Sequence, residues 1–250
     1  MEPSNFESRM RELEYYHSLR LIPGAWTVIR VDGRSFTRFT GDHFERPFDE
    51  RFRDHMITTA ITLMDELDAI YSYTESDEIS VLLPPQWNFF DRELEKVVSV
   101  SAGIASAAFT LSCSKFAHFD SRVWLGINEE RVIDYFRWRQ ADAARCSLNG
   151  WAYWTLRDKG CSVKEASEML ESKTPDYKQE LLFQHGINFN DLPNWQRRGI
   201  GFYKEEYQKE GFNPMTQEKT IATRQRIRVD MELPMKDEYA EFLYSLITAS

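Results

Sequence analysis

Apolar side chains along the first half of the chain follow two periods, one typical of strands and the other of helices. Residues 26–32 are a β-branched run that ends at Gly33 and predicts a buried strand. Residues 49–68 carry apolar side chains three and four positions apart and predict a helix. Residues 71–74 and 79–83 flank a short acidic segment and predict two strands joined by a tight turn.

The segments that follow complete a known order of elements. We expect a helix over 91–113, where small side chains indicate close packing, and a fourth strand over 121–125. The order β-α-β-β-α-β is the split βαβ (ferredoxin-like) arrangement of an antiparallel sheet with helices on one face. The sequence therefore predicts an α+β core over residues 1–128.

Residues 129–250 are expected to form a mostly helical extension packed on this core, with a soft boundary between the two parts. No internal repeat or low-complexity tract divides the chain further. The expected elements are helices over 129–158, 162–172 and 176–185, a loop-rich stretch over 186–220, a strand over 223–229 and a helix over 236–247.

The composition of the 250 residues indicates a folded chain. The 17 Phe, 11 Tyr and 7 Trp require a core that shields them from water, which excludes intrinsic disorder. No apolar run approaches the ~20 residues of a membrane span, and no signal-peptide core is recognisable at the N-terminus. The three cysteines and five histidines lack the spacing of a zinc site, so we expect reduced thiols and a cytoplasmic protein.

The formal net charge of −9 disfavours a polyanionic partner on average, but the charge is uneven along the chain. Residues 195–228 hold eight Lys and Arg against four Asp and Glu, which leaves 23 basic and 36 acidic residues elsewhere. A basic strip on an acidic body is compatible with nucleic-acid binding and equally with an ordinary solvated face.

Two acidic positions fall at informative places. Asp32 ends the first predicted strand before Gly33, and Asp77 and Glu78 occupy the turn of the predicted hairpin. In a split βαβ sheet the first strand lies beside the hairpin, so these carboxylates can converge at one edge of the sheet. Such hard oxygen ligands suit Mg²⁺, and two ions of this kind assist displacement at phosphorus. Asp-Gly and Ser-Asp-Glu are also common turn sequences, so a purely structural role stays open.

Basic side chains near these positions could hold a triphosphate, although each is also explained as a surface charge. Arg92 and Lys96 lie four residues apart and would share one helical face. Neither a GxxxxGK[ST] loop nor a GxGxxG turn occurs, which excludes P-loop and Rossmann nucleotide sites. The candidates are Arg34, Arg46, Arg92, Lys96 and Arg122.

Three segments carry a family resemblance: Ile29-Arg-Val-Asp-Gly-Arg-Ser-Phe36, Thr74-Glu-Ser-Asp-Glu-Ile-Ser80 and Trp138-Arg-Gln-Ala-Asp142. They resemble the tRNA-His guanylyltransferases and the related Thg1-like proteins. The likeness continues through residues 178–183, 188–193 and 197–199. It implies a catalytic core like the palm of polymerases and a nucleotidyltransferase that extends the 5′ end of tRNA in the 3′-to-5′ direction.

The resemblance also implies roles for individual residues. Asp32, the Gly33 carbonyl and Asp77 would bind two Mg²⁺ ions, with Glu78 as an accessory acid. ATP or GTP would activate a 5′-monophosphate, and the 3′-hydroxyl of an incoming nucleotide would attack the activated phosphate. The nucleotide and its triphosphate would contact Gly33, Arg34, Ser35, Phe36, Arg46, Ser76, Arg92, Lys96 and Arg122.

The macromolecular partner that the resemblance implies is tRNA. Arg224, Arg226 and Arg228 alternate in the basic strip, so on a strand they would share one face. A homotetramer is typical of the family, and no membrane partner is expected. The candidate tRNA contacts are Arg139, Lys178, Asn188, Arg197, Arg198, Arg224, Arg226 and Arg228.

One segment departs from the family pattern. Where tRNA-His guanylyltransferases carry His-Ile-Asn-Asn-Leu-Tyr-Asn, residues 144–150 read Ala-Arg-Cys-Ser-Leu-Asn-Gly. The departure favours the Thg1-like branch, which repairs 5′-truncated tRNA by template-directed addition. The alternatives are a tRNA-His guanylyltransferase that adds the extra 5′ G, a non-catalytic tRNA-binding protein on a palm fold, and a nucleotidyl cyclase on a similar sheet. The cyclase does not account for the motifs beyond residue 138.

Overall fold

An antiparallel sheet of six strands runs through the computed structural model, which describes residues 3–212 and 219–248. Its strand order is β4-β1-β3-β2-β5-β6, and each neighbouring pair is antiparallel. The first four strands pair as a split βαβ core requires, so the predicted α+β fold is confirmed. The strands are β1 (Trp26–Gly33), β2 (Tyr71–Glu75), β3 (Glu78–Leu83), β4 (Phe119–Gly126), β5 (Ile200–Phe212) and β6 (Lys219–Asp230).

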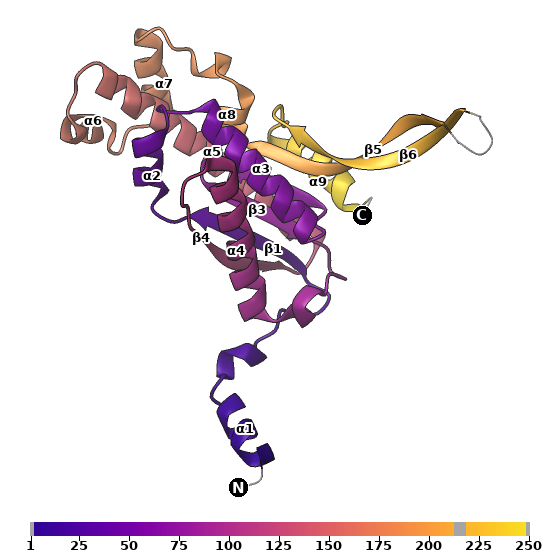
Figure 1. Ribbon diagram of the computed structural model, residues 1–250. Helices are drawn as coiled ribbons and strands as arrows, with labels where there is room; N and C mark the ends of the chain where they lie inside the picture. Colours follow the sequence, from indigo (N-terminus) through magenta and orange to yellow (C-terminus); the bar gives the residue numbers. More distant parts are fainter. Residues whose placement is uncertain (1–2, 213–218, 249–250) are drawn as a thin grey trace.

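One face of the sheet is covered by α3 (Glu50–Glu66) and α4 (Leu94–Cys113) (Figure 1). Ile29 and Val31 of β1 point to this face and pack with buried side chains of both helices, among them Phe109. These residues lie two apart because successive side chains of a strand point to opposite faces. A short helix that the sequence did not predict, α2 (Phe36–His43), follows β1 directly.

The opposite face is covered by α5 (Glu129–Asp158) and α9 (Lys236–Thr248), against which Trp26 and Val28 of β1 pack. The prediction of helices on one face therefore holds for the core helices alone, and the C-terminal extension covers the second face. β1 is buried on both sides, so apolar side chains occur on both faces of the strand instead of on alternate positions only.

The helices predicted for the extension are confirmed with shifted ends. The short helices between residues 163 and 198 pack on the C-terminal half of α5. At the other end of the molecule, the N-terminal segment leads away from the sheet (Figure 1). The helix predicted over 91–113 begins only at Leu94. The remaining helices are α1 (Pro3–Arg11), η1 (Tyr15–Ser18), η2 (Phe89–Arg92), α6 (Val163–Leu170), α7 (Pro175–Gln184), η3 (Phe189–Asp191) and α8 (Asn194–Arg198).

β5 and β6 form a two-stranded ribbon that projects from the body (Figure 1). β2 pairs with β5 only from Tyr71↔Tyr203 to Thr74↔Ile200, so β6 is the sole described neighbour of the outer part of β5. The predicted loop-rich stretch over 186–220 is wrong here. Among the described residues no element covers a face of the outer part of β5, so residues 204–210 are mostly polar on both sides and lack the alternation that marks a strand.

α4 has the length and composition of a membrane span, with 20 residues and a mean hydropathy of 1.4 over its apolar window. The expectation that no apolar segment approaches the ~20 residues of a membrane span was wrong. In the structure the helix lies on the sheet, and Val97, Ala105 and Phe109 are fully buried in the core. A core helix meets the same two criteria, and packing on the sheet accounts for the buried stripe of α4, although only 22% of its apolar window is buried.

Candidate active site

The end of β1 and the β2–β3 turn bring the two predicted carboxylates together. Asp32 lies opposite Glu78 in the β1–β3 register, and Gly33 donates its backbone N–H to the carbonyl of Asp77 at 3.0 Å. Ser76, which has a φ of 49°, forms the two-residue turn with Asp77 and donates its hydroxyl to Asp77 Oδ1 at 3.0 Å. The convergence predicted from the strand order is therefore confirmed.

Arginines lie near both carboxylates, with Arg122, Arg30 and Arg139 acting on Asp32 and Arg46 acting on Asp77, yet the pKa of both carboxyls is raised. Burial raises the pKa of Asp32, and burial together with the charge of Asp32 raises the pKa of Asp77. The Arg122 guanidinium, 4.0 Å from Asp32 Oδ2, opposes the rise in the pKa of Asp32. Partly buried carboxylates that repel each other are stabilised by a cation between them, and hard oxygen ligands suit Mg²⁺. The donor set therefore fits the divalent ion that the sequence predicts.

Gly33 makes room for an aromatic ring as well as for a ligand. A Cβ at Gly33 would lie 2.4 Å from Cγ of Phe36. Phe36 is 2% exposed and packs against Phe109, so its ring belongs mainly to the core. Between Gly33 and Phe36, the Arg34 side chain is exposed. Ser35 adopts a φ of 60° before α2 begins. The turn thus presents Arg34 outward and places Phe36 inward.

A cavity of about 230 Å³ lies beside Asp77, and Ser76 and Asp77 are part of its wall. Arg46, also in the wall, donates to the Thr37 carbonyl at 2.7 Å, and its guanidinium lies 5.5 Å from the centre of the Trp154 ring. Aromatic rings next to cations suit a nucleotide base and its phosphates. Further lining residues are Phe36, Phe44, Phe48, Cys146, Ser147, Gly150 and Trp195.

The segment that departs from the family pattern belongs to this cavity wall. Residues 144–150 lie within α5, and Cys146, Ser147 and Gly150 line the cavity. Ser147 is buried, and its hydroxyl has no hydrogen-bond partner among the described residues. This part of the cavity wall is therefore built from small side chains.

Arg92 and Lys96 lie far from this site. They stand just before and in the first turn of α4, whereas Phe109 near the other end of that helix packs against Phe36. The helical segment from Lys96 to Phe109 spans about 20 Å. Lys96 pairs with Glu93 at 3.2 Å, and Arg92 donates to two backbone carbonyls. This placement contradicts the prediction that both join the triphosphate site of their own chain.

Arg139, a predicted tRNA contact, lies inside the protein. Its guanidinium donates to Glu78 Oε1 at 2.6 Å and to Glu75 Oε1 at 2.7 Å, and its side chain is 7% exposed. Burial separates it from any tRNA backbone, so the assignment is wrong. Both carboxylate oxygens of Glu78 accept from Arg139, which holds Glu78 in an ion-pair cluster and not as a free accessory acid. Burial raises the pKa of Glu78 and raises the pKa of Glu75 to about 8.

The other candidate contacts in the helical region have partners within the chain. Lys178 donates to a side-chain oxygen of α5 at 2.7 Å, and Asn188 caps η3. Arg197 and Arg198 donate to backbone carbonyls at 3.0 and 2.9 Å. Their proposed contacts with tRNA stay predictions.

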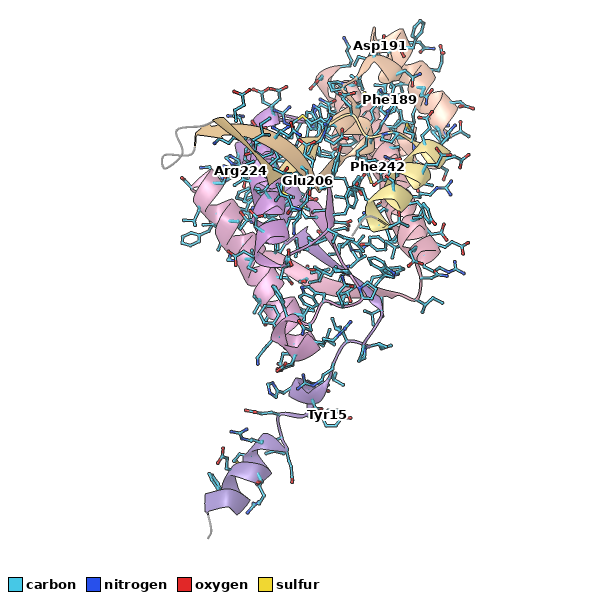
Figure 2. All side chains as sticks on the ribbon, turned by 90° about the vertical axis from the view of Figure 1, so that its right-hand side faces the viewer. Tyr15, Phe189, Asp191, Glu206, Arg224 and Phe242 are labelled. Atoms are coloured by element: carbon cyan, nitrogen blue, oxygen red, sulfur yellow. The ribbon has the colours of Figure 1, made fainter. Side chains whose placement is uncertain are left out.

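Arg224, Arg226 and Arg228 share one face of the ribbon, as their alternation predicts. Glu205 lies opposite Arg226 on that face and accepts from Arg226 at 2.6 Å and from Arg228 at 3.3 Å. Arg224 is exposed and lies opposite Tyr207, nearer the tip (Figure 2). Glu205 thus partly neutralises the two arginines of this face that lie nearer the body of the protein, Arg226 and Arg228.

Sequence reasoning missed Arg30. It lies two residues before Asp32 on the same face of β1, with its Nε 3.8 Å from Glu78 and its guanidinium 5.7 Å from the centre of the Trp138 ring. Its Nε is buried without a hydrogen-bond partner in the part of the chain described. The available signal was a charged residue within an otherwise apolar strand, because such a residue is buried only for a reason.

Two family models match the chain. The model described as tRNAHis guanylyltransferase matches residues 7–132, and the one described as Thg1 C terminal domain matches residues 130–239. The chain is 35% identical to a probable tRNA(His) guanylyltransferase of Drosophila melanogaster, over 72% of this chain and 67% of that protein. It is 32% identical to a probable tRNA(His) guanylyltransferase of Dictyostelium discoideum, over 85% and 86% of the two chains.

Solved structures resemble the whole fold. A bacterial tRNA(His) guanylyltransferase (Thg1)-like protein in complex with GTP superposes with a TM-score of 0.74 at 28% identity, covering 97% of this chain and 99% of that one. The complex of such a protein with ATP gives a TM-score of 0.76 at 27% identity, covering 96% and 98%. Both similarities extend over the sheet, the cavity and the C-terminal extension.

Proposed function

Because the chain belongs to the tRNAHis guanylyltransferase family of nucleotidyltransferases, we propose that it repairs 5′-truncated tRNA by template-directed addition of nucleotides in the 3′-to-5′ direction. The observation that carries the finer assignment is the cavity wall made by Cys146, Ser147 and Gly150. These small side chains replace the His- and Asn-rich motif of the guanylyltransferases. Without the histidine and asparagines of that motif, this part of the wall offers fewer donors and acceptors to a base, so base identity would come from pairing with the opposite strand.

Asp32, the Gly33 carbonyl and Asp77 would hold Mg²⁺. The bound ion would neutralise phosphate charge and favour the deprotonated form of an attacking hydroxyl. The support for this assignment is the convergence of two partly buried carboxylates, whose pKa values are raised although arginines lie nearby.

The side chains around the cavity would position the nucleotide. Arg46 and the Ser76 hydroxyl line the cavity beside Asp77 and would bind the phosphates, and the aromatic wall would take the base. Arg34 and Arg122, both exposed near Asp32, would bind the tRNA 5′ end. Positioning and charge neutralisation dominate phosphoryl transfer, so these contacts carry most of the catalysis.

The chemistry would proceed in two displacements at phosphorus. A 5′-monophosphate end attacks ATP or GTP and releases pyrophosphate, which leaves a 5′–5′ pyrophosphate link. The 3′-hydroxyl of the incoming nucleotide then attacks the tRNA-linked phosphorus and releases the activating nucleoside monophosphate. A 5′-triphosphate end enters at the second step, with pyrophosphate as the leaving group. Relatives solved with GTP and with ATP support both activating nucleotides.

The tRNA would contact the basic face of the β5–β6 ribbon, because its arginines can pair with phosphates without reading sequence. We also propose a homotetramer in the cytoplasm. The exposed apolar side chains of the N-terminal segment, Leu13, Tyr15 and Tyr16 among them, support an assembly that covers them.

A second candidate is addition of the extra 5′ G to tRNA-His, which the names of the curated relatives favour. The experiment offers a 5′-truncated tRNA with a 5′-triphosphate, Mg²⁺ and all four NTPs to the wild type and to Asp77→Asn. Asp42→Asn, an exposed change on α2, is the matched control. Extension that stops when the acceptor stem is fully paired supports repair.

Two other outcomes contradict the proposal. Addition of one G whatever the opposite base supports the guanylyltransferase. Tight tRNA binding without any extension supports a non-catalytic binding protein. We expect Asp77→Asn to abolish extension while tRNA binding stays nearly unchanged, because the substitution weakens metal binding alone.

A further inference from the structure

Two carboxylates face each other on either side of the turn that carries Asp77. Glu75 ends β2 and Glu78 begins β3, and the two are direct partners in the β2–β3 register. Their side chains are 9% and 12% exposed, so little water screens them. Like charges directly opposite on a hairpin are destabilising, and most strongly so where water is excluded. A cation at this point offsets the repulsion whenever both carboxyls are ionised.

Arg139 of α5 supplies that cation. Its Nε donates to Glu78 Oε1 at 2.6 Å, and its Nη2 donates to Glu78 Oε2 at 2.8 Å and to Glu75 Oε1 at 2.7 Å. Its Nη1 lies 3.3 Å from Asp142 Oδ2 on the next turn of the same helix. The guanidinium also lies 4.8 Å from the centre of the Trp138 ring. Its orientation is thus fixed by ion pairs on one side and an aromatic ring on another.

We propose that Arg139 is a positioning residue that fixes the Ser76–Asp77 turn against α5 and so holds Asp77 in place for the metal. The inference rests on the proposed function for the identity of the metal and the reaction. The same helix supplies Cys146, Ser147 and Gly150 to the cavity wall, so the clamp also sets the distance between that wall and the carboxylates.

A lysine cannot replace this clamp. The two parallel donors to Glu78 and the donor to Glu75 come from one planar fork, whereas an ammonium is a single point of charge. Arg139→Lys keeps the buried charge, so the chain should still fold, but the turn is no longer held at both of its ends. Removing a partner that orients a metal ligand costs about 10–100-fold in metal affinity or activity.

The test compares the wild type, Arg139→Lys and Arg139→Met, with Arg145→Lys as the matched control. Arg145 pairs with Asp142 on the exposed side of the same helix. Mn²⁺ binding without tRNA is followed by electron paramagnetic resonance, and kcat, KM for NTP and Kd for tRNA are measured separately. Melting temperatures separate misfolding from mispositioning, and a variant that has lost its cooperative melting transition is left out of the comparison.

We expect Arg139→Lys to weaken Mn²⁺ binding and lower kcat by about 10–100-fold each while Kd for tRNA stays within twofold. Arg145→Lys should change none of these values. Mn²⁺ affinity and kcat equal to the wild type would overturn the proposal, and so would a raised Kd for tRNA with unchanged Mn²⁺ binding. A wild type that binds Mn²⁺ through Asp32 and Asp77 but never extends tRNA would refute the proposed function, and the Mn²⁺ result would still decide the role of Arg139.

Discussion

The ring of Phe36 leaves no room for a side chain at Gly33. A methyl group there would overlap Phe36, whose ring is packed among other aromatic rings and cannot move freely. We expect Gly33→Ala to lower the free energy of unfolding by about 1–3 kcal/mol through overpacking. Denaturant titration measures this loss, and extension activity should fall with it because the neighbouring Asp32 shifts.

Gly103 is the matched control for Gly33. It lies within α4, and nothing lies within 4 Å of an added Cβ. Alanine has the better helix propensity, so Gly103→Ala should raise the free energy of unfolding by about 0.5–1 kcal/mol. Equal denaturation midpoints for the two variants would show that the Phe36 ring does not constrain position 33.

Asp49 gives the fold a pH-dependent contribution. It begins α3 and accepts from the backbone of Glu45 and from Arg51, and the Arg51 hydrogen bonds hold its pKa well below its usual range. Because the folded pKa lies below the unfolded one, the ionised carboxylate stabilises the fold fully above about pH 4 and ceases to do so as the pH falls through the folded value.

We therefore expect Asp49→Ala to cost about 1 kcal/mol at pH 7. The difference in unfolding free energy between this variant and the wild type should stay constant from about pH 5 to 8 and shrink below about pH 4. The exposed Asp42→Ala serves as the reference. A difference that grows on acidification would mean that Asp49 is not stabilised in its charged form.

Individual site residues differed in how far the sequence could locate them. Asp32 and Asp77 could be brought together because strand order alone decides which strand ends are neighbours. The role of Arg139 could not be predicted, because the sequence motif does not show whether its side chain lies on the buried or the exposed face of the helix. Its burial depends on how α5 packs on the second face of the sheet, which no local pattern encodes.

Among the elements, the β5–β6 ribbon carries the clearest test of tRNA binding. Glu205 accepts from two of the three arginines on the basic face, whereas Glu206 points to the other face (Figure 2). We expect Glu205→Gln to strengthen tRNA binding several-fold and Glu206→Gln, with the same change in net charge, to have a smaller effect. Arg224→Ala should weaken binding and reduce the salt dependence by about one phosphate contact.

Filter binding at several salt concentrations measures these effects. Equal gains from Glu205→Gln and Glu206→Gln would show that only the net charge matters and that neither face is preferred.

Elements were predictable where a buried face imposed a period. The core strands and α3 were located from apolar spacing because each packs against another layer. The sequence did not reveal β5 because, within residues 3–212 and 219–248, its outer half pairs with β6 but is not covered by a helix or a second sheet, so burial imposes no alternation on it. α2 escaped because its apolar residues merge with the turn that follows β1.

For the whole molecule, the length of α4 separates Lys96 from Asp77. If Lys96 serves a triphosphate, as the family resemblance implies, it must do so in the site of a neighbouring subunit. We expect Lys96→Ala and Asp77→Asn each to be inactive and their co-assembled mixture to regain activity, because a mixed site combines an intact carboxylate pair with an intact lysine. Extension rates of the mixture no higher than the sum of the separate variants would contradict this arrangement.

The β5–β6 ribbon is attached to the rest of the sheet at one end. Twelve residue pairs join β5 to β6, but only four join β5 to β2, so the outer length is supported at one end alone. The point of attachment is β2, and the last residue of this strand leads into the Ser76–Asp77 turn. A force applied near Arg224 would therefore act on β2, which leads into the turn with the proposed metal ligand Asp77, so RNA docked on the ribbon would be coupled mechanically to that turn.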